Sequence, residues 1–157
     1  MPTFAPSSLE PVRSQRASIA LRVHPSLPLL VLDAGVIAQQ LTDATIAPVP
    51  MCAPWFRGVA RHGGQIVPFF DLALWVEVER RRERATTMIS IASGPCFLGL
   101  LASEPPMILP AGRSIVPWAG KADWIARGAN PDVACAFDPP TWLAEIAPTL
   151  LMKAARP

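Results

Sequence analysis

The chain has 157 residues, of which 51% are hydrophobic and 17% charged, and its formal net charge is +2. Such a chain is long enough to bury a core and too apolar for wholesale disorder, and its charge gives no reason to expect a polyanionic partner. Its 19 prolines exclude long helices and predict short elements joined by turns.

Strand-like patterns follow a polar lead at the N-terminus. Alternating apolar residues in "SIALRV" (18–23) predict a half-buried strand, and "LLVLD" (29–33) predicts a second strand. In "AGVIAQQL" (34–41), Val36, Ile37 and Leu41 would share one side of a helix, which predicts one or two helical turns.

A hairpin is predicted next. The runs "WFRGVAR" (55–61) and "QIVPFFDL" (65–72) flank His62, Gly63 and Gly64, and glycine accepts the positive φ that tight hairpin turns need. Pro68 cannot donate a hydrogen bond to a neighbouring strand, so we expect its strand to lie at a sheet edge or to be bulged at this position.

The second half begins after a charged segment, "EVERRRER" (77–84), which we interpret as a solvated connector. Two further strands, "ATTMISIA" (85–92) and "CFLGLLA" (96–102), are expected to pair across a turn, and the proline-rich stretch 104–117 is expected to be irregular. Near the end, Asp138 can cap a helix that starts at Pro139, and Pro148 is expected to end or kink that helix.

Two segments of the chain share one plan. Residues 55–76 and 124–146 each show an aromatic entry, an Arg and a Gly, a turn, apolar residues, an Asp and then a Trp. Trp55 and Asp71 in the first segment correspond to Trp124 and Asp138 in the second. A plan used twice predicts two similar β subdomains packed together.

The cellular compartment can be predicted from the N-terminus and the cysteines. Residues 1–18 lack a basic start followed by an apolar stretch, so they do not resemble a signal peptide. The most apolar run (27–38) is interrupted by Asp33 and is too short to cross a bilayer. Cys52, Cys96 and Cys135 are scattered, with no Cys-x-x-Cys pair. We therefore expect a cytoplasmic protein with reduced cysteines and no direct membrane insertion.

The central stretch 46–72, "IAPVPMCAPWFRGVARHGGQIVPFFDL", resembles the signature of CheW-like domains, the coupling proteins of bacterial chemosensory systems. The matching positions are Pro50, Pro54, Trp55, Gly58, Val59, Gly64, Ile66, Val67, Pro68, Asp71 and Leu72. The resemblance extends over residues 17–146. It suggests a flexible lead (1–16), a CheW-like domain of two β subdomains (17–147) and a C-terminal tail (148–157).

The resemblance implies an all-β fold of two five-stranded β-barrels that share an apolar interface, with a short C-terminal helix. It implies a non-catalytic adaptor without a cofactor. Its partners would be the signalling tip of a chemoreceptor of the methyl-accepting type and the regulatory domain of a CheA-type histidine kinase, in a chemotaxis-like or type IV pilus pathway. An alternative stays open: a small-ligand-binding β protein that has lost ordinary coupling, with its ligand in the groove between the barrels.

One departure from the family bears on the receptor contact. The family commonly carries an Arg just before the turn glycine, where this chain has Gly63, and Arg61 lies two residues earlier. Trp118 is expected to be an exposed tryptophan, the residue type favoured at interface hot spots. The candidate partner-binding residues are Arg57, Arg61, His62, Gly63, Arg80, Arg82 and Trp118.

Other chemistry is weakly supported. His24 and His62 have no neighbours at metal-ligand spacing. Asp71 and Asp138 could form a pair of carboxylates for acid–base catalysis, but their positions at strand ends favour capping. The basic run 80–84 is interleaved with glutamates and has no aromatic residues for base stacking. We therefore expect no metal, no cofactor and no nucleic acid partner.

Overall fold

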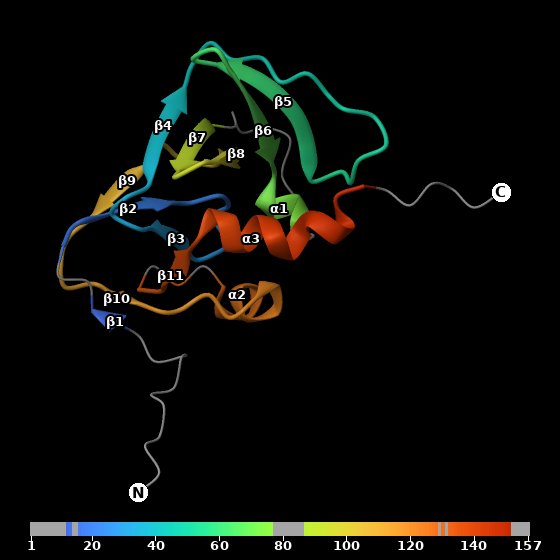
Figure 1. The fold of residues 1–157 in the computed structure, drawn as a ribbon. Helices are drawn as coiled ribbons and strands as arrows, with labels where there is room; N and C mark the ends of the chain where they lie inside the picture. Colours follow the sequence, from blue (N-terminus) through green and yellow to red (C-terminus); the bar gives the residue numbers. More distant parts are fainter. Residues whose placement is uncertain (1–11, 14–15, 77–86, 129, 131, 152–157) are drawn as a thin grey trace, which may run out of the picture.

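The computed structural model describes residues 12–13, 16–76, 87–128, 130 and 132–151. It consists mostly of strands in two main sheets, which form two lobes (Figure 1). The four-stranded sheet has the order β11-β3-β2-β9, with β2 Ser18–Leu21, β3 Leu29–Leu32, β9 Met107–Leu109 and β11 Ala134–Phe137. The five-stranded sheet has the order β4-β7-β8-β6-β5, with β4 Ile37–Leu41, β5 Phe56–His62, β6 Gln65–Phe70, β7 Thr87–Ser93 and β8 Cys96–Ala102.

Short elements complete the fold. A two-stranded sheet pairs β1 (Val12–Arg13) with β10 (Ser114–Ile115), so part of the predicted N-terminal lead is paired in the structure. The helical elements are α1 Leu72–Trp75, α2 Lys121–Arg127, α3 Pro139–Ile146 and the 3₁₀ turn η1 Ala147–Thr149. The prediction that Pro148 ends the C-terminal helix is confirmed, because the chain passes into η1 there. The charged segment 77–84 lies outside the described residues.

The five-stranded sheet curls until its two edge strands approach each other. Beyond β4, Ala47 exchanges two backbone hydrogen bonds with Val59 of β5, at 2.8 and 2.9 Å. Nearer the hairpin, His62 Nε2 of β5 lies 3.3 Å from Gln39 Oε1 of β4. The all-β class with a short C-terminal helix is confirmed. However, among the described residues the sheets do not close into the barrels that the resemblance implied, and the second lobe has four strands in its sheet.

The main core fills the space between the lobes. It takes residues from both sheets, including Leu30 and Leu32 of β3 and Leu98 and Leu100 of β8, all at most 2% exposed. Aromatic rings pack together in the part of this core where the C-terminal helix α3 runs beside α1 (Figure 1). A second, smaller core lies inside the curl of the five-stranded sheet and includes Phe69. Successive side chains of β6 therefore point into different cores, with Phe69 in the smaller core and Phe70 in the main core. This follows from the two-residue period of a strand.

The second half of the shared plan, from the apolar strand through Asp to the helix, has the same structure in both segments. β6 leads through Asp71 into α1, and β11 leads through Asp138 into α3. Each of these strands also pairs in parallel with another strand, β6 with β8 and β11 with β3. The first half of the plan differs, because Trp55 precedes a strand whereas Trp124 lies in helix α2.

Three local predictions were wrong. Residues 37–41 form the strand β4, and no helix forms there, because the segment pairs along its whole length with β7. The strand β2 is buried on both faces at Ala20 and Leu21, since the small sheet β1–β10 lies beside a second cluster containing Ala20. The proline-rich stretch 104–117 contains β9 and β10.

Pro68 also lies in a setting different from the expected one. Its strand β6 is interior, and the register shift falls in β5 between Phe56 and Gly58. Val59, which faces Pro68 across the ladder, directs its backbone hydrogen bonds to Ala47. The Val59–Pro68 pair is therefore a non-hydrogen-bonded pair. Pairing with β8 begins only at Phe69, so no ladder bond needs the missing N–H of Pro68.

Candidate interaction surface

The predicted hairpin is confirmed at the centre of the signature. His62 pairs with Gln65, and the two residues between them are Gly63 with φ +56° and Gly64 with φ +76°. Both φ values lie in the left-handed region that two-residue hairpin turns of type I′ require. Gly63 is exposed at the tip, so the position where the family commonly carries an Arg presents only backbone.

Gly58 fixes how the loop before the hairpin packs. Its φ is +128°, and a Cβ at this position would lie 2.1 Å from the carbonyl oxygen of Ala47. Only glycine therefore allows the Ala47–Val59 bridge to form across β5. The segment 48–54, which carries Pro50 and Pro54, follows this bridge and returns to β5. The signature thus builds one feature: a proline-rich loop held closely against the edge of the five-stranded sheet.

Asp71 and Asp138 have the same structural role. The side chain of Asp71 accepts a hydrogen bond from Leu74 N at 3.2 Å, and that of Asp138 accepts one from Thr141 N at 3.1 Å. Both residues are N-caps in extended conformation. The backbone of Asp71 also donates to Trp55 O at 2.7 Å, which ties the loop before β5 to the end of β6. The capping prediction is confirmed for both residues.

The candidate arginines divide into two groups. Arg57 and Arg61 are both exposed residues of β5, while Gly58 and Ala60 are buried. Arg57 lies at the register shift between Phe56 and Gly58, and Arg61 lies next to the hairpin turn. Arg80 and Arg82 lie outside the described residues. Trp118 was expected to be exposed, which is wrong: it is partly buried and packs against Trp75, Trp124 and Phe137.

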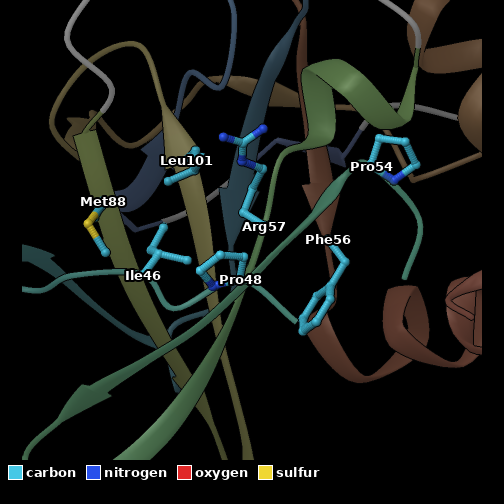
Figure 2. A pocket seen from close by; sticks show the side chains of 7 residues that line it. All are labelled: Ile46, Pro48, Pro54, Phe56, Arg57, Met88 and Leu101. Carbon is cyan, nitrogen blue, oxygen red and sulfur yellow. The ribbon is translucent and has the colours of Figure 1, made fainter. Parts of the chain in front are cut away.

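An open groove of about 540 Å³ lies beside Arg57 (Figure 2). Its lining comes from the loop, from β5 and from the end of the curled sheet: Ile46, Pro48, Pro54, Phe56, Arg57, Met88 and Leu101. In the view of Figure 2, Ile46, Met88 and Leu101 lie on one side of Arg57, and Phe56 and Pro54 lie on the other. Arg57 is the one charged residue of this lining, so the groove combines apolar walls with a single cation.

Exposed apolar side chains continue from the groove along the loop. Met51, with φ +65°, is 64% exposed. The next residue, Cys52, forms a backbone bridge with Leu151, which is 69% exposed. Neighbouring large apolar side chains left open to solvent are typical of surfaces that bind another protein. We call the groove together with Met51 and Leu151 the loop surface.

Two of the three thiols, those of Cys96 and Cys135, are poorly suited to chemistry. Burial raises the pKa of Cys135 to about 11. Burial, and secondly the nearby carboxylate of Asp138, also raises the pKa of Cys96. Both side chains are therefore protonated at neutral pH, and it is the thiolate that acts as nucleophile or metal ligand. Within the described ranges no three His, Cys, Asp or Glu residues gather as a metal site would require.

Comparison with known proteins identifies the family. The model of the family described as "CheW-like domain" matches residues 20–109, which is more than half of the chain. The chain belongs to the CheW-like domain family. The matched range includes the hairpin, Gly58, the loop and the five-stranded sheet. The resemblance inferred from the signature is thus confirmed.

A solved structure agrees with the family match. The scaffolding protein TtCheW from Thermoanaerobacter tengcongensis superposes with a TM-score of 0.51 at 18% sequence identity, covering 62% of this chain. At that identity the likeness concerns the fold. This chain spans 66% of the length of TtCheW, slightly less than two thirds. A search of curated proteins finds no significant match.

Sequence reasoning found some parts of this surface and missed others. Pro54 and Gly58 were identified from the signature, and Arg57 was named as a candidate partner-binding residue. Met88 and Leu101 were missed, because only the curl of the sheet brings β7 and β8 to the loop. Gln39 was missed because residues 34–41 were interpreted as helical. Ala47 was missed because only the curl of the sheet brings it to Val59.

In the part of the chain that the structure describes, no helix has the length and apolar character needed to cross a bilayer.

Proposed function

We propose that this chain is a non-catalytic scaffold that couples chemoreceptors of the methyl-accepting type to a CheA-type histidine kinase in the cytoplasm. The observation that carries the proposal is the CheW-like signature at one surface, with Gly58 packed against Ala47 and the proline-rich loop held beside an open groove. The domain responsible would span residues 17–147.

The loop surface suits the regulatory domain of such a kinase. Apolar walls bury area against a partner, and exposed apolar side chains at Met51 and Leu151 extend the contact beyond the groove. No described residue forms an ion pair with Arg57, so its guanidinium is open to an acidic group on the partner. We therefore expect an apolar contact with one carboxylate opposite Arg57.

A scaffold role also fits what the reactive groups do. Both candidate carboxylates cap helices, and the Cys96 and Cys135 thiols have raised pKa values. The two candidate carboxylates are thus engaged in building the fold, and these two thiols are protonated at neutral pH. These observations support a protein that works by docking, without forming or breaking bonds.

The test is a calorimetric titration of the purified chain with the regulatory domain of the kinase from the same cell. We expect saturable binding with a Kd of about 10 μM or tighter, and Arg57→Gln should weaken it about tenfold, which corresponds to about 1.4 kcal/mol. Arg127→Gln is the matched control, because Arg127 makes a half-buried ion pair with Asp123 on the other lobe, away from the loop surface. Absence of binding to any kinase or receptor tip of that cell would overturn the proposal.

We also propose which residues contact the receptor and which kind of pathway the scaffold serves. Gly63 offers no side chain at the hairpin tip, so we propose that Arg61 and His62 supply the polar contacts to the receptor tip. Arg80 and Arg82 are proposed as further contacts to the kinase. Such a surface would suit a specialised pathway such as one controlling type IV pili. Titration with receptor-tip peptides should show weakening by Arg61→Gln, whereas equal affinities would contradict this assignment.

A further inference from the structure

A second cavity opens at the hairpin end of the curled sheet, on its concave face. It has a volume of about 210 Å³ and takes side chains from all five strands of the sheet. Strand register explains why they meet. Gln39 of β4 lies opposite Ser90 of β7, and Ile37 lies opposite Ala92, which in turn faces Phe97 of β8. His62 and Gln65 close the cavity from the hairpin.

The lining separates into an apolar and a polar row. Ile37, Ala92 and Phe97 form one row across the sheet, and Phe97 is 38% exposed. Gln39 and Ser90 form the adjacent row, with His62 Nε2 3.3 Å from Gln39 Oε1. A molecule in this space would lie against an apolar wall and meet amide, hydroxyl and imidazole groups on its other side. Binding pockets for small molecules typically combine these features.

The residues of this cavity also limit the class of ligand. The lining contains no Asp, Glu, Lys or Arg. A charged ligand would lose hydration without gaining a counter-charge, so an uncharged one is favoured. Amide side chains both donate and accept hydrogen bonds, which suits a ligand with both kinds of group. The volume lies below the roughly 300 Å³ at which pockets for drug-sized ligands begin, so there is room for a small ring system only.

We propose that this cavity binds a small uncharged nitrogen heterocycle, of the kind represented by a nucleobase or nicotinamide, held by the amide of Gln39 and packed against Phe97. The proposal does not depend on the kinase contact, because none of the lining residues of the cavity belongs to the groove beside Arg57. The cavity does share His62 with the proposed receptor contact, so the test below leaves His62 unchanged.

The test uses adenine, uracil and nicotinamide as probes, with two-dimensional amide NMR of the full chain. We expect at least one probe to give saturable shifts that correspond to a Kd of about 1 mM or tighter. Gln39→Leu should weaken this binding at least tenfold. Gln40→Leu is the matched control, since the neighbouring residue is exposed on the opposite face of the same strand.

A second variant keeps the test decisive. Ala92→Trp fills the cavity from its floor and should abolish binding while the amide spectrum stays dispersed. Should that variant not fold, the comparison of Gln39→Leu with Gln40→Leu decides alone. The proposal is overturned if none of the three probes saturates up to about 10 mM, well above that Kd. It is also overturned if the Gln39 and Gln40 variants bind equally well.

Discussion

Trp75 and Trp142 pack edge to face at the centre of the molecule, with ring centroids 5.7 Å apart and an interplanar angle of 85°. Each of them lies four residues after the aspartate that caps its helix, Trp75 after Asp71 and Trp142 after Asp138. The two halves of the repeat therefore meet through equivalent side chains. Edge-to-face pairs stabilise beyond the area they bury, by about 0.5–1.5 kcal/mol.

Trp142→Ala should lower the free energy of unfolding by about 3–5 kcal/mol, because it removes a ring that is 1% exposed and contacts Phe70, Trp75 and Phe137. Urea unfolding measures the change. Trp142→Phe should cost less, since the indole N–H has no hydrogen-bond partner among the described residues and leaves no acceptor unpaired when removed. Equal losses in the two variants would contradict this explanation.

Gly58→Ala should destabilise the protein by at least about 2 kcal/mol, because the added Cβ meets Ala47 O and the φ of +128° strains any residue with a side chain. Gly35→Ala is the control: nothing lies within 4 Å of a Cβ there. We expect the control to change stability little in chemical denaturation. A Gly58 variant as stable as the Gly35 variant would show that the Ala47–Val59 bridge is not held as closely as described.

Asp138→Ala should lower stability by about 1 kcal/mol through the loss of the N-cap of α3, whereas Asp138→Asn should retain most of it, because asparagine caps nearly as well. Thermal and urea unfolding monitored by tryptophan fluorescence provide the measurement. If alanine and asparagine behave alike, the side-chain hydrogen bond to Thr141 N contributes no stability.

The thiol of Cys135 should remain protonated until about pH 11 in the folded protein and ionise at its ordinary, lower pKa when unfolded. Between these two pKa values the folded state binds more protons than the unfolded state, so the free energy of unfolding should fall as the pH rises towards 11. Thiolate absorbance, in a Cys52→Ser, Cys96→Ser background, follows the titration. The chain has no tyrosine, so no tyrosinate band interferes. Cys135→Ala should remove this part of the pH dependence, and its persistence would contradict the assignment.

A chain that begins at residue 17 should still fold, because the domain is proposed to span residues 17–147. This shorter chain loses the pairing of β1 with β10, which involves two residue pairs. We expect its free energy of unfolding to be lower by about 1–2 kcal/mol. A chain that begins at residue 12 is the control and should lose little. Failure of the shorter chain to fold would move the domain boundary towards the N-terminus.

The sequence predicted those elements whose signals are local. The glycine turn, the alternating strands and the Asp-Pro helix start each depend on a few neighbouring residues, and each was found. Segment 34–41 was misassigned because Val36, Ile37 and Leu41 fit a helical period equally well, and only pairing with β7 decides for a strand. Strands β9 and β10 were missed because their partners, β2 and β1, lie about 90 or more residues earlier in the chain.

The site was predictable only to the extent that it follows the signature. Arg57 and Gly58 were identified because they belong to one continuous stretch. Trp118 was expected to be exposed because its flanks, "VP" and "AGK", resemble a loop, yet rings distant in sequence cover it. Burial depends on tertiary partners, which a single sequence does not display.

The order of strands along the chain has a consequence for synthesis. Every strand of the five-stranded sheet lies at or before Ala102, so that lobe can fold on the growing chain once Ala102 has left the ribosome. The four-stranded sheet must wait for β11, which ends at Phe137. Until then the edge of β3 that β11 later covers stays open, and this apolar edge is the segment of the nascent protein that chaperones would need to shield.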